Sequence, residues 1–154
     1  MERDLSWLDG STLGDLSTDG SAMLFSETQE AGGSEGSVYL RKSDGSPPVR
    51  LGSGVGLSLS PDGKWVLALP RSRNELHLLP TGVGEPRVIK GNFASYWADA
   101  HWLPGGKRIV FIAIEPKHDP RIYVQELSGS PRAISAEGLI YGALPSPEIG
   151  RAHV

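Results

Sequence analysis

The sequence predicts an all-β protein in which one four-stranded unit recurs, and two observations support this prediction. Four turn segments follow one another at a constant interval of 43 residues, namely 16–20, 59–63, 102–106 and 145–149. Between them, apolar residues form short runs that alternate with polar residues, as in half-buried strands. A period of roughly 40–50 residues in an all-strand pattern is typical of β-propeller blades. We therefore predict a partial β-propeller of about three four-stranded antiparallel blades plus the start of a fourth.

The first repeat spans about residues 8–51 and places Asp19 and Gly20 in its first turn. Apolar runs at 23–25, 38–41 and 49–51 predict its later strands, and Ser-Asp-Gly-Ser at 43–46 predicts the turn between the last two. Aspartate bonds its own backbone in such turns and glycine accepts a positive φ, so both residue types have a steric reason to be there.

The second repeat, at about 55–89, follows the same plan. Runs at 55–60 and 65–69 flank the turn Pro61-Asp62-Gly63, and runs at 76–79 and 87–89 complete the predicted sheet. Proline presets φ at the first turn position, which favours a tight hairpin between the two strands.

The third repeat, at about 96–134, has runs at 96–102, 109–113, 122–125 and 132–134. Its first turn carries Gly105 and Gly106 where the second repeat has Asp62 and Gly63, so the turn is kept without the carboxylate. Twelve prolines and the period-2 runs leave little room for a helix. A β-sandwich is the alternative architecture, but sandwich strands do not repeat one turn chemistry at a fixed interval.

The end of the chain has two interpretations. Residues 139–147 are predicted to begin the next repeat, which makes 1–147 an incomplete propeller. Residues 148–154 can be back-translated as GAG ATC GGA AGA GCA CAC GTC, which resembles a widely used sequencing adapter. On that hypothesis they are a non-native tail. The alternative is a degenerate turn at 146–151 with one inserted residue.

Composition argues against several functional classes. The net charge of −3 and the pI near 5.8 give no basic face for nucleic acid. The chain contains no cysteine, so a disulfide framework and a thiolate metal site are both excluded. No run approaches the ~18 apolar residues of a membrane span, and the first residues lack a signal-peptide core. The compartment is left open, because an export signal could lie upstream.

The segment Leu57-Ser58-Leu59-Ser60-Pro61-Asp62-Gly63-Lys64-Trp65-Val66 resembles the repeats of TolB-like, WD-repeat-like propellers, whose core is Ser-Pro-Asp-Gly-Lys before an apolar strand. Segments 4–7, 38–41 and 78–82 also resemble propeller regions attached to bacterial serine/threonine protein kinases and winged-helix regulators. The resemblance implies a six- or seven-bladed ring with a binding or scaffolding role and no catalytic chemistry in the blades.

Three residues of the third repeat are the candidate ligand contacts. Alternation along 96–102 places Trp97, Asp99 and His101 on one face of the predicted innermost strand. An aspartate and a histidine two residues apart could meet a ligand in the channel. The alternative is that they bond each other and the neighbouring backbone.

Other motifs have structural explanations. Gly-Gly-Ser-Glu-Gly at 32–36 matches the Gly-x-Ser-x-Gly of a nucleophile elbow, but no buried strand and helix flank it. Glycines at 52, 54 and 56 are better explained by close strand packing than by a phosphate cradle. Four histidines form no metal-binding pattern, and the dispersed arginines are typical of a solvated face. We expect neither catalytic residues nor a cofactor.

We therefore predict a non-catalytic propeller fragment that binds a protein or small ligand, as the sensory or scaffolding part of a larger bacterial signalling protein. Its other expected partners are the remaining blades of the parent propeller. The alternative is the gating propeller of a prolyl-oligopeptidase-like serine peptidase, whose catalytic domain would lie outside this sequence.

Overall fold

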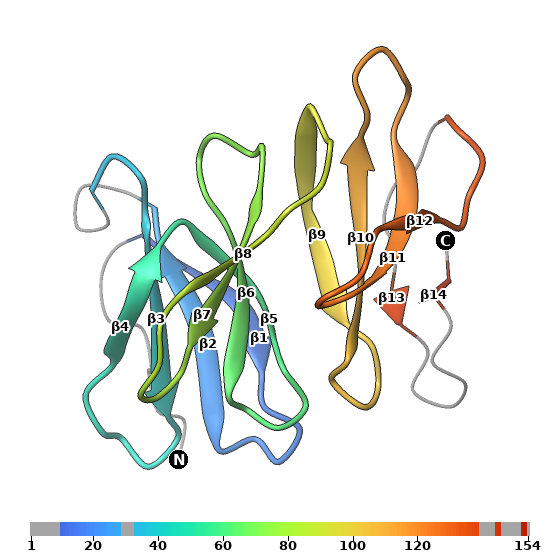
Figure 1. The fold of residues 1–154 in the computed structure, drawn as a ribbon. Helices are drawn as coiled ribbons and strands as arrows, with labels where there is room; N and C mark the ends of the chain where they lie inside the picture. Colours follow the sequence, from blue (N-terminus) through green and yellow to red (C-terminus); the bar gives the residue numbers. More distant parts are fainter. Residues whose placement is uncertain (1–9, 29–32, 139–143, 146–151, 154) are drawn as a thin grey trace.

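The computed structural model describes residues 10–28, 33–138, 144–145 and 152–153. These residues form strands, turns and loops, and no helix occurs among them. The all-β class predicted from the sequence is confirmed. Three four-stranded antiparallel sheets follow one another along the chain and stand side by side (Figure 1).

Each sheet is an up-and-down meander whose strand order in space equals its order in sequence. The first sheet contains β1 (Ser11–Leu16), β2 (Ala22–Glu27), β3 (Ser37–Lys42) and β4 (Val49–Ser53). The second contains β5 (Val55–Leu59), β6 (Trp65–Leu69), β7 (Leu76–Pro80) and β8 (Arg87–Ile89). The third contains β9 (Ser95–Trp102), β10 (Arg108–Ile114), β11 (Arg121–Glu126) and β12 (Arg132–Ala133).

A separate two-stranded pair is made by β13 (Leu144–Pro145) and β14 (Ala152–His153). Apart from these four residues, the predicted start of a fourth repeat at 139–147 and the predicted tail at 148–154 lie outside the described residues.

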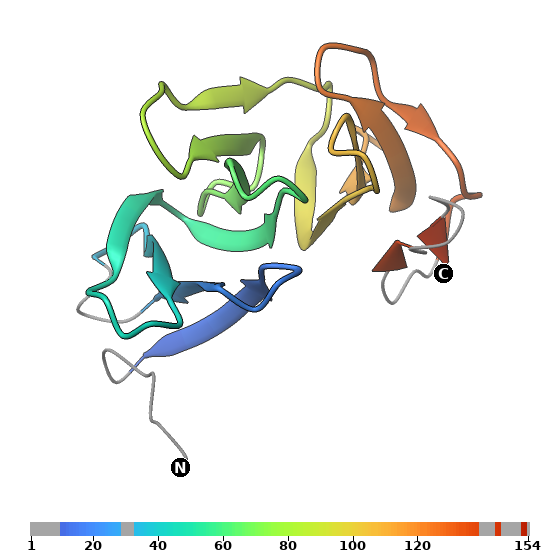
Figure 2. The same ribbon diagram turned by 90° about the horizontal axis from the view of Figure 1, so that it is seen from below.

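The first strand of each sheet is the innermost one, since β5 contacts both β1 and β9 (Figure 2). In the first two sheets this strand carries a one-residue bulge at equivalent positions, Gly14 and Leu57. The third sheet differs, because its ladder is regular at Ala100 and irregular between Tyr96 and Ala100. The irregularity falls within the segment that holds Trp97 and Asp99. The alternation expected for 96–102 is nevertheless kept at Tyr96, Ala100 and Trp102, which belong to one apolar cluster, and at Trp97, which packs against another.

The apolar core is divided into clusters between neighbouring sheets. The cluster between the first and second sheets contains Leu24, Val38, Leu59, Val66, Ala68 and Leu79. The cluster between the second and third sheets is larger and includes Leu67, Leu78, Phe93, Tyr96, Trp102, Phe111 and Tyr123. A smaller cluster on the other face of the third sheet contains Leu103, Val110, Ile112 and Ile122.

The glycine-rich segment at 52–56 packs closely, as its sequence predicts. A Cβ added to Gly52 would lie 2.9 Å from a Leu79 methyl carbon, and one added to Gly56 would lie 2.9 Å from a Val38 methyl carbon.

Among the described residues, no helix is long and apolar enough to cross a membrane.

Candidate functional site

The ends of the three innermost strands converge on one hollow, which we call the strand-end hollow. It encloses about 430 Å³ and takes three equivalent positions from each repeat. The first position is Asp15, Ser58 and His101; the second is Leu16, Leu59 and Trp102; the third is Thr18, Pro61 and Pro104. The constant 43-residue period therefore places three chemically different groups, a carboxylate, a hydroxyl and an imidazole, around one space.

Two of these groups link neighbouring sheets. Asp15 Oδ2 accepts hydrogen bonds from the backbone N–H of Leu59 at 2.8 Å and from Ser58 Oγ at 3.3 Å. Ser58 Oγ in turn accepts a hydrogen bond from the backbone N–H of Trp102 at 3.4 Å. At both junctions, a side chain at the end of one innermost strand thus accepts a hydrogen bond from the backbone N–H of the residue 44 positions later, in the next sheet. These bonds hold the walls of the hollow in place.

The third group is bonded within its own strand. His101 Nε2 lies 2.7 Å from Asp99 Oδ1, and both side chains are about a quarter exposed, at 27% and 23%. The mutual bond that the sequence left as an alternative is therefore present. His101 lines the strand-end hollow, whereas Asp99 is not part of its lining and bonds His101. Trp97 is half-buried and packs against the outer cluster of the third sheet, which contains Val110, the cross-strand partner of His101. Trp97 and His101 therefore share one face of the sheet, although Trp97 does not line the hollow.

Among the described residues, the polar groups of the strand-end hollow are hydrogen-bonded, but not to one another in a catalytic arrangement. Ser58 is buried and bonds Asp15, while His101 bonds Asp99, and no hydrogen bond between Ser58 and His101 occurs among the described residues. The arrangement therefore lacks the serine–histidine contact of a nucleophile. Within the same residues, no group of three or more metal-binding side chains gathers.

Four of the turn residues predicted from the sequence, Asp19, Pro61, Asp62 and Gly63, line a groove beside the hollow. Asp19 accepts hydrogen bonds from Ser21 and Ser17, which lower its pKa to about 2. Asp62 accepts bonds from Ser60 Oγ and the Lys64 N–H, which also lower its pKa. Pro61 lines the hollow directly. These carboxylates are therefore structural acceptors of their own turns.

The glycines of these turns have left-handed backbone conformations. Gly20 and Gly63 have φ values of 69° and 68°. In the third turn both Gly105 and Gly106 have positive φ, at 89° and 67°. The backbone conformation therefore differs from that of the second turn at the position where Gly105 replaces Asp62.

Sequence reasoning missed Asp15 and the arginines Arg71 and Arg73. Asp15 could have been found, because it precedes Ser58 and His101 by one and two periods. The two arginines gave no such signal, since their loop has no equivalent length in the other repeats. They line a separate pocket at the opposite end of β5.

No protein-family model and no curated protein matches the sequence. The fold resembles solved propellers. A TolB from Acinetobacter baumannii has a TM-score of 0.68 at 18% identity, over 86% of this chain and 34% of that protein. A chain of a nidogen/laminin complex has a TM-score of 0.65 at 14% identity, over 87% and 51%. A prolyl endopeptidase has a TM-score of 0.57 at 16% identity, over 90% and 23%.

These likenesses establish the fold, because the identities are too low to establish more. The partial β-propeller predicted from the sequence is confirmed, and the TolB-like character of its repeats is supported. The chain spans about a third of the A. baumannii TolB and about half of the nidogen/laminin chain.

Proposed function

We propose that this chain is a non-catalytic segment of a larger propeller, and that it binds a protein or small ligand at the strand-end hollow. The main observation in support is that Asp15, Ser58 and His101 line the same hollow. Ligand sites commonly combine an apolar lining with a few fixed polar groups. Leu16, Leu59 and Trp102 provide that lining here.

Trp102 supports the proposal independently. Its side chain is buried at 5% exposure, and its Nε1–H has no hydrogen-bond acceptor among the described residues. A buried donor without an acceptor costs about 1–3 kcal/mol. A ligand acceptor in the strand-end hollow could satisfy this donor, so binding there would recover part of that cost.

We propose a sensory or scaffolding role within a bacterial signalling protein, on the resemblance of segments 38–41 and 78–82 to kinase-attached propellers. The second candidate is the gating propeller of a prolyl-oligopeptidase-like peptidase, and the likeness to a prolyl endopeptidase favours it. The natural reading frame separates the two. A kinase or winged-helix domain in that frame would support the first, and an α/β-hydrolase domain the second.

Binding at the strand-end hollow is tested by NMR screening of short peptides and metabolites against the labelled chain. We expect a ligand whose addition shifts resonances of Leu16, His101 and Trp102 together. The double variant Asp99→Ala/His101→Ala should lose these shifts while keeping the thermal midpoint.

The chain contains a matched control for this variant. His77 Nε2 lies 2.7 Å from Glu75 Oε1, and the His77 side chain is 27% exposed, like His101, but the pair lies away from the hollow. Glu75→Ala/His77→Ala should keep binding. Equal loss in both double variants, or a large loss of stability with binding intact in the first, would assign Asp99 and His101 to structure.

A further inference from the structure

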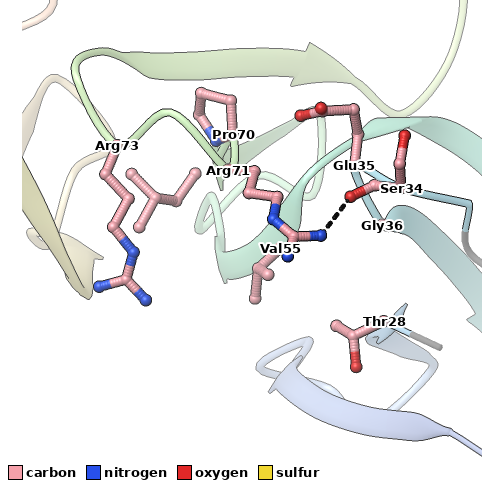
Figure 3. A pocket seen from close by; sticks show the side chains of 9 residues that line it. Thr28, Ser34, Glu35, Gly36, Val55, Pro70, Arg71 and Arg73 are labelled. Atoms are coloured by element: carbon pink, nitrogen blue, oxygen red, sulfur yellow. Dashed lines mark hydrogen bonds between the residues drawn. The ribbon is translucent and has the colours of Figure 1, made fainter.

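A second pocket lies at the end of β5 opposite to the strand-end hollow. We call it the arginine pocket. It encloses about 250 Å³ between the loop after β2 and the loop after β6. Its lining includes Glu35 from the first loop, Arg71 and Arg73 from the second, and Val55 at the start of β5. Figure 3 shows both arginine side chains leaving the same loop, with Arg71 reaching across to Ser34.

The loop that carries the two arginines is fixed on both sides. Arg71 Nη1 donates a hydrogen bond to the Ser34 carbonyl at 2.6 Å, which ties the loop to the first sheet. The Arg73 carbonyl accepts a bond from the Tyr96 N–H at 2.6 Å, which ties it to the third sheet. Arg73 also has a φ of 56°, a conformation that persists only where the surroundings impose it. The backbone that carries the two arginine side chains is therefore fixed by hydrogen bonds to both neighbouring sheets.

Among the described residues, neither arginine of the arginine pocket forms an ion pair. The partner of Arg71 is a neutral carbonyl oxygen, and the described residues include no carboxylate within ion-pair distance of either arginine. Glu35 is the one acidic residue in the described lining, and it pairs with neither. Each guanidinium carries paired N–H groups that can bind a carboxylate in a fork geometry, and neither is occupied by a carboxylate of the described residues.

We propose that the arginine pocket binds a glutamate or aspartate side chain of an acidic peptide segment in a partner protein. Apolar surface from Val55, Leu69 and Pro70 lines the same pocket and suits the methylene groups of such a side chain. Glu35 adds one negative charge to the lining, which disfavours a phosphate dianion more than a single carboxylate. This site is separate from the strand-end hollow and does not depend on it.

The test uses the whole chain and a fluorescein-labelled six-glutamate peptide at low ionic strength. Fluorescence anisotropy should show saturable binding, and a six-glutamine peptide should not bind. Arg71→Gln/Arg73→Gln should weaken binding by about tenfold or more, because hydrogen bonds to charged groups are among the strongest. Asp99→Ala/His101→Ala should leave binding of this peptide unchanged.

The third sheet supplies the matched control. Arg108 and Arg132 also share a hollow with one glutamate, Glu126, but that hollow is built on a single sheet. Arg108→Gln/Arg132→Gln removes the same charge and should change the affinity less than about twofold, as expected for distant screened charges. Equal weakening in both double variants would overturn the proposal in favour of nonspecific attraction. Competition by inorganic phosphate at least as strong as by glutamate would overturn the assignment to a peptide carboxylate.

Discussion

The two junctions between neighbouring sheets are packed in different ways. The first junction, between the first and second sheets, is aliphatic and depends on glycine. A Cβ on Gly14 would lie 2.4 Å from the Gly56 carbonyl oxygen, so the innermost strands approach backbone to backbone. The second junction, between the second and third sheets, is aromatic. There Phe93 lies with its ring centroid 5.6 Å from Phe111 and 4.7 Å from Tyr123.

At the first junction the close approach depends on the missing side chain of Gly14, whereas aromatic rings fill the second junction. Each junction has a hydrogen bond between residues 44 positions apart in the sequence. The Leu59 N–H donates to Asp15 Oδ2 at 2.8 Å, and the Trp102 N–H donates to Ser58 Oγ at 3.4 Å. The shorter bond ends on the charged Asp15 carboxylate and the longer one on the neutral Ser58 hydroxyl, and hydrogen bonds to charged acceptors are the shorter kind. We expect the first junction to be sensitive to added volume and the second to removed volume.

The largest expected effect comes from emptying the second junction. Phe111 is 1% exposed and contacts the rings of Phe93, Tyr96 and Tyr123. Phe111→Ala should lower the free energy of unfolding by about 3–5 kcal/mol, because a cavity remains where the ring was. Urea unfolding followed by far-UV circular dichroism measures this. Val83→Ala, at a fully exposed position, is the control, and a loss below about 1 kcal/mol for Phe111→Ala would contradict the prediction.

Filling the first junction should have the next largest effect. Gly14→Ala pushes a methyl group against a backbone oxygen, which cannot rotate away, and overpacking of this kind costs about 1–3 kcal/mol. Gly82→Ala is the matched control, because an added Cβ there meets no atom within 4 Å. If both variants melt at the same temperature, the close approach at the first junction is not tight in solution.

A third variant separates backbone strain from packing. Gly63 has a φ of 68°, yet an added Cβ would meet nothing within 4 Å. Gly63→Ala should therefore destabilise by about 1–2 kcal/mol through backbone conformation alone. Its loss should stay the same when combined with Gly14→Ala, since additive costs identify independent sites. A cost for Gly63→Ala as small as that for Gly82→Ala would remove the strain argument.

The smallest effect concerns acid and the turn at Asp19. Because hydrogen bonds from Ser21 and Ser17 lower the pKa of Asp19 to about 2, its contribution to stability is present above pH 4. It should be lost as the pH falls from about 4 to about 2. Thermal midpoints of the wild type and Asp19→Asn should therefore differ at pH 5 and converge near pH 2. A constant difference over this range would contradict the assignment.

The fold was predictable because the same strand and turn pattern occurs in each repeat of the sequence. A fixed interval, a turn chemistry with steric reasons and period-2 apolar runs located the strands of the second sheet, β5 to β8, to within a residue. The site was predicted less well. The alternation rule placed Trp97, Asp99 and His101 on one face, and the pairing of His101 with Val110 agrees with this for Trp97 and His101, but of the three residues His101 alone lines the strand-end hollow.

The arginine pocket was not predictable, because it depends on tertiary contacts. Arg71 and Arg73 are adjacent in sequence to no acidic or aromatic partner that would distinguish them from other surface arginines. What distinguishes them is the Ser34 carbonyl, which is 37 residues away, and the Tyr96 N–H, which belongs to another sheet.

The hydrogen bonds that join neighbouring innermost strands, from Leu59 to Asp15 and from Trp102 to Ser58, have a consequence for local unfolding. Consecutive strands pair within each four-stranded sheet, and the two junctions described join neighbouring sheets, so opening is expected to proceed sheet by sheet from the ends. Among the described residues, the second sheet is the one that lies between two four-stranded sheets, with β5 bonded to Asp15 on one side and to Trp102 on the other. Amide protons of β5 and β6 should therefore exchange with solvent water more slowly than those of β1 and β2, giving the chain a rigid centre with more mobile flanks.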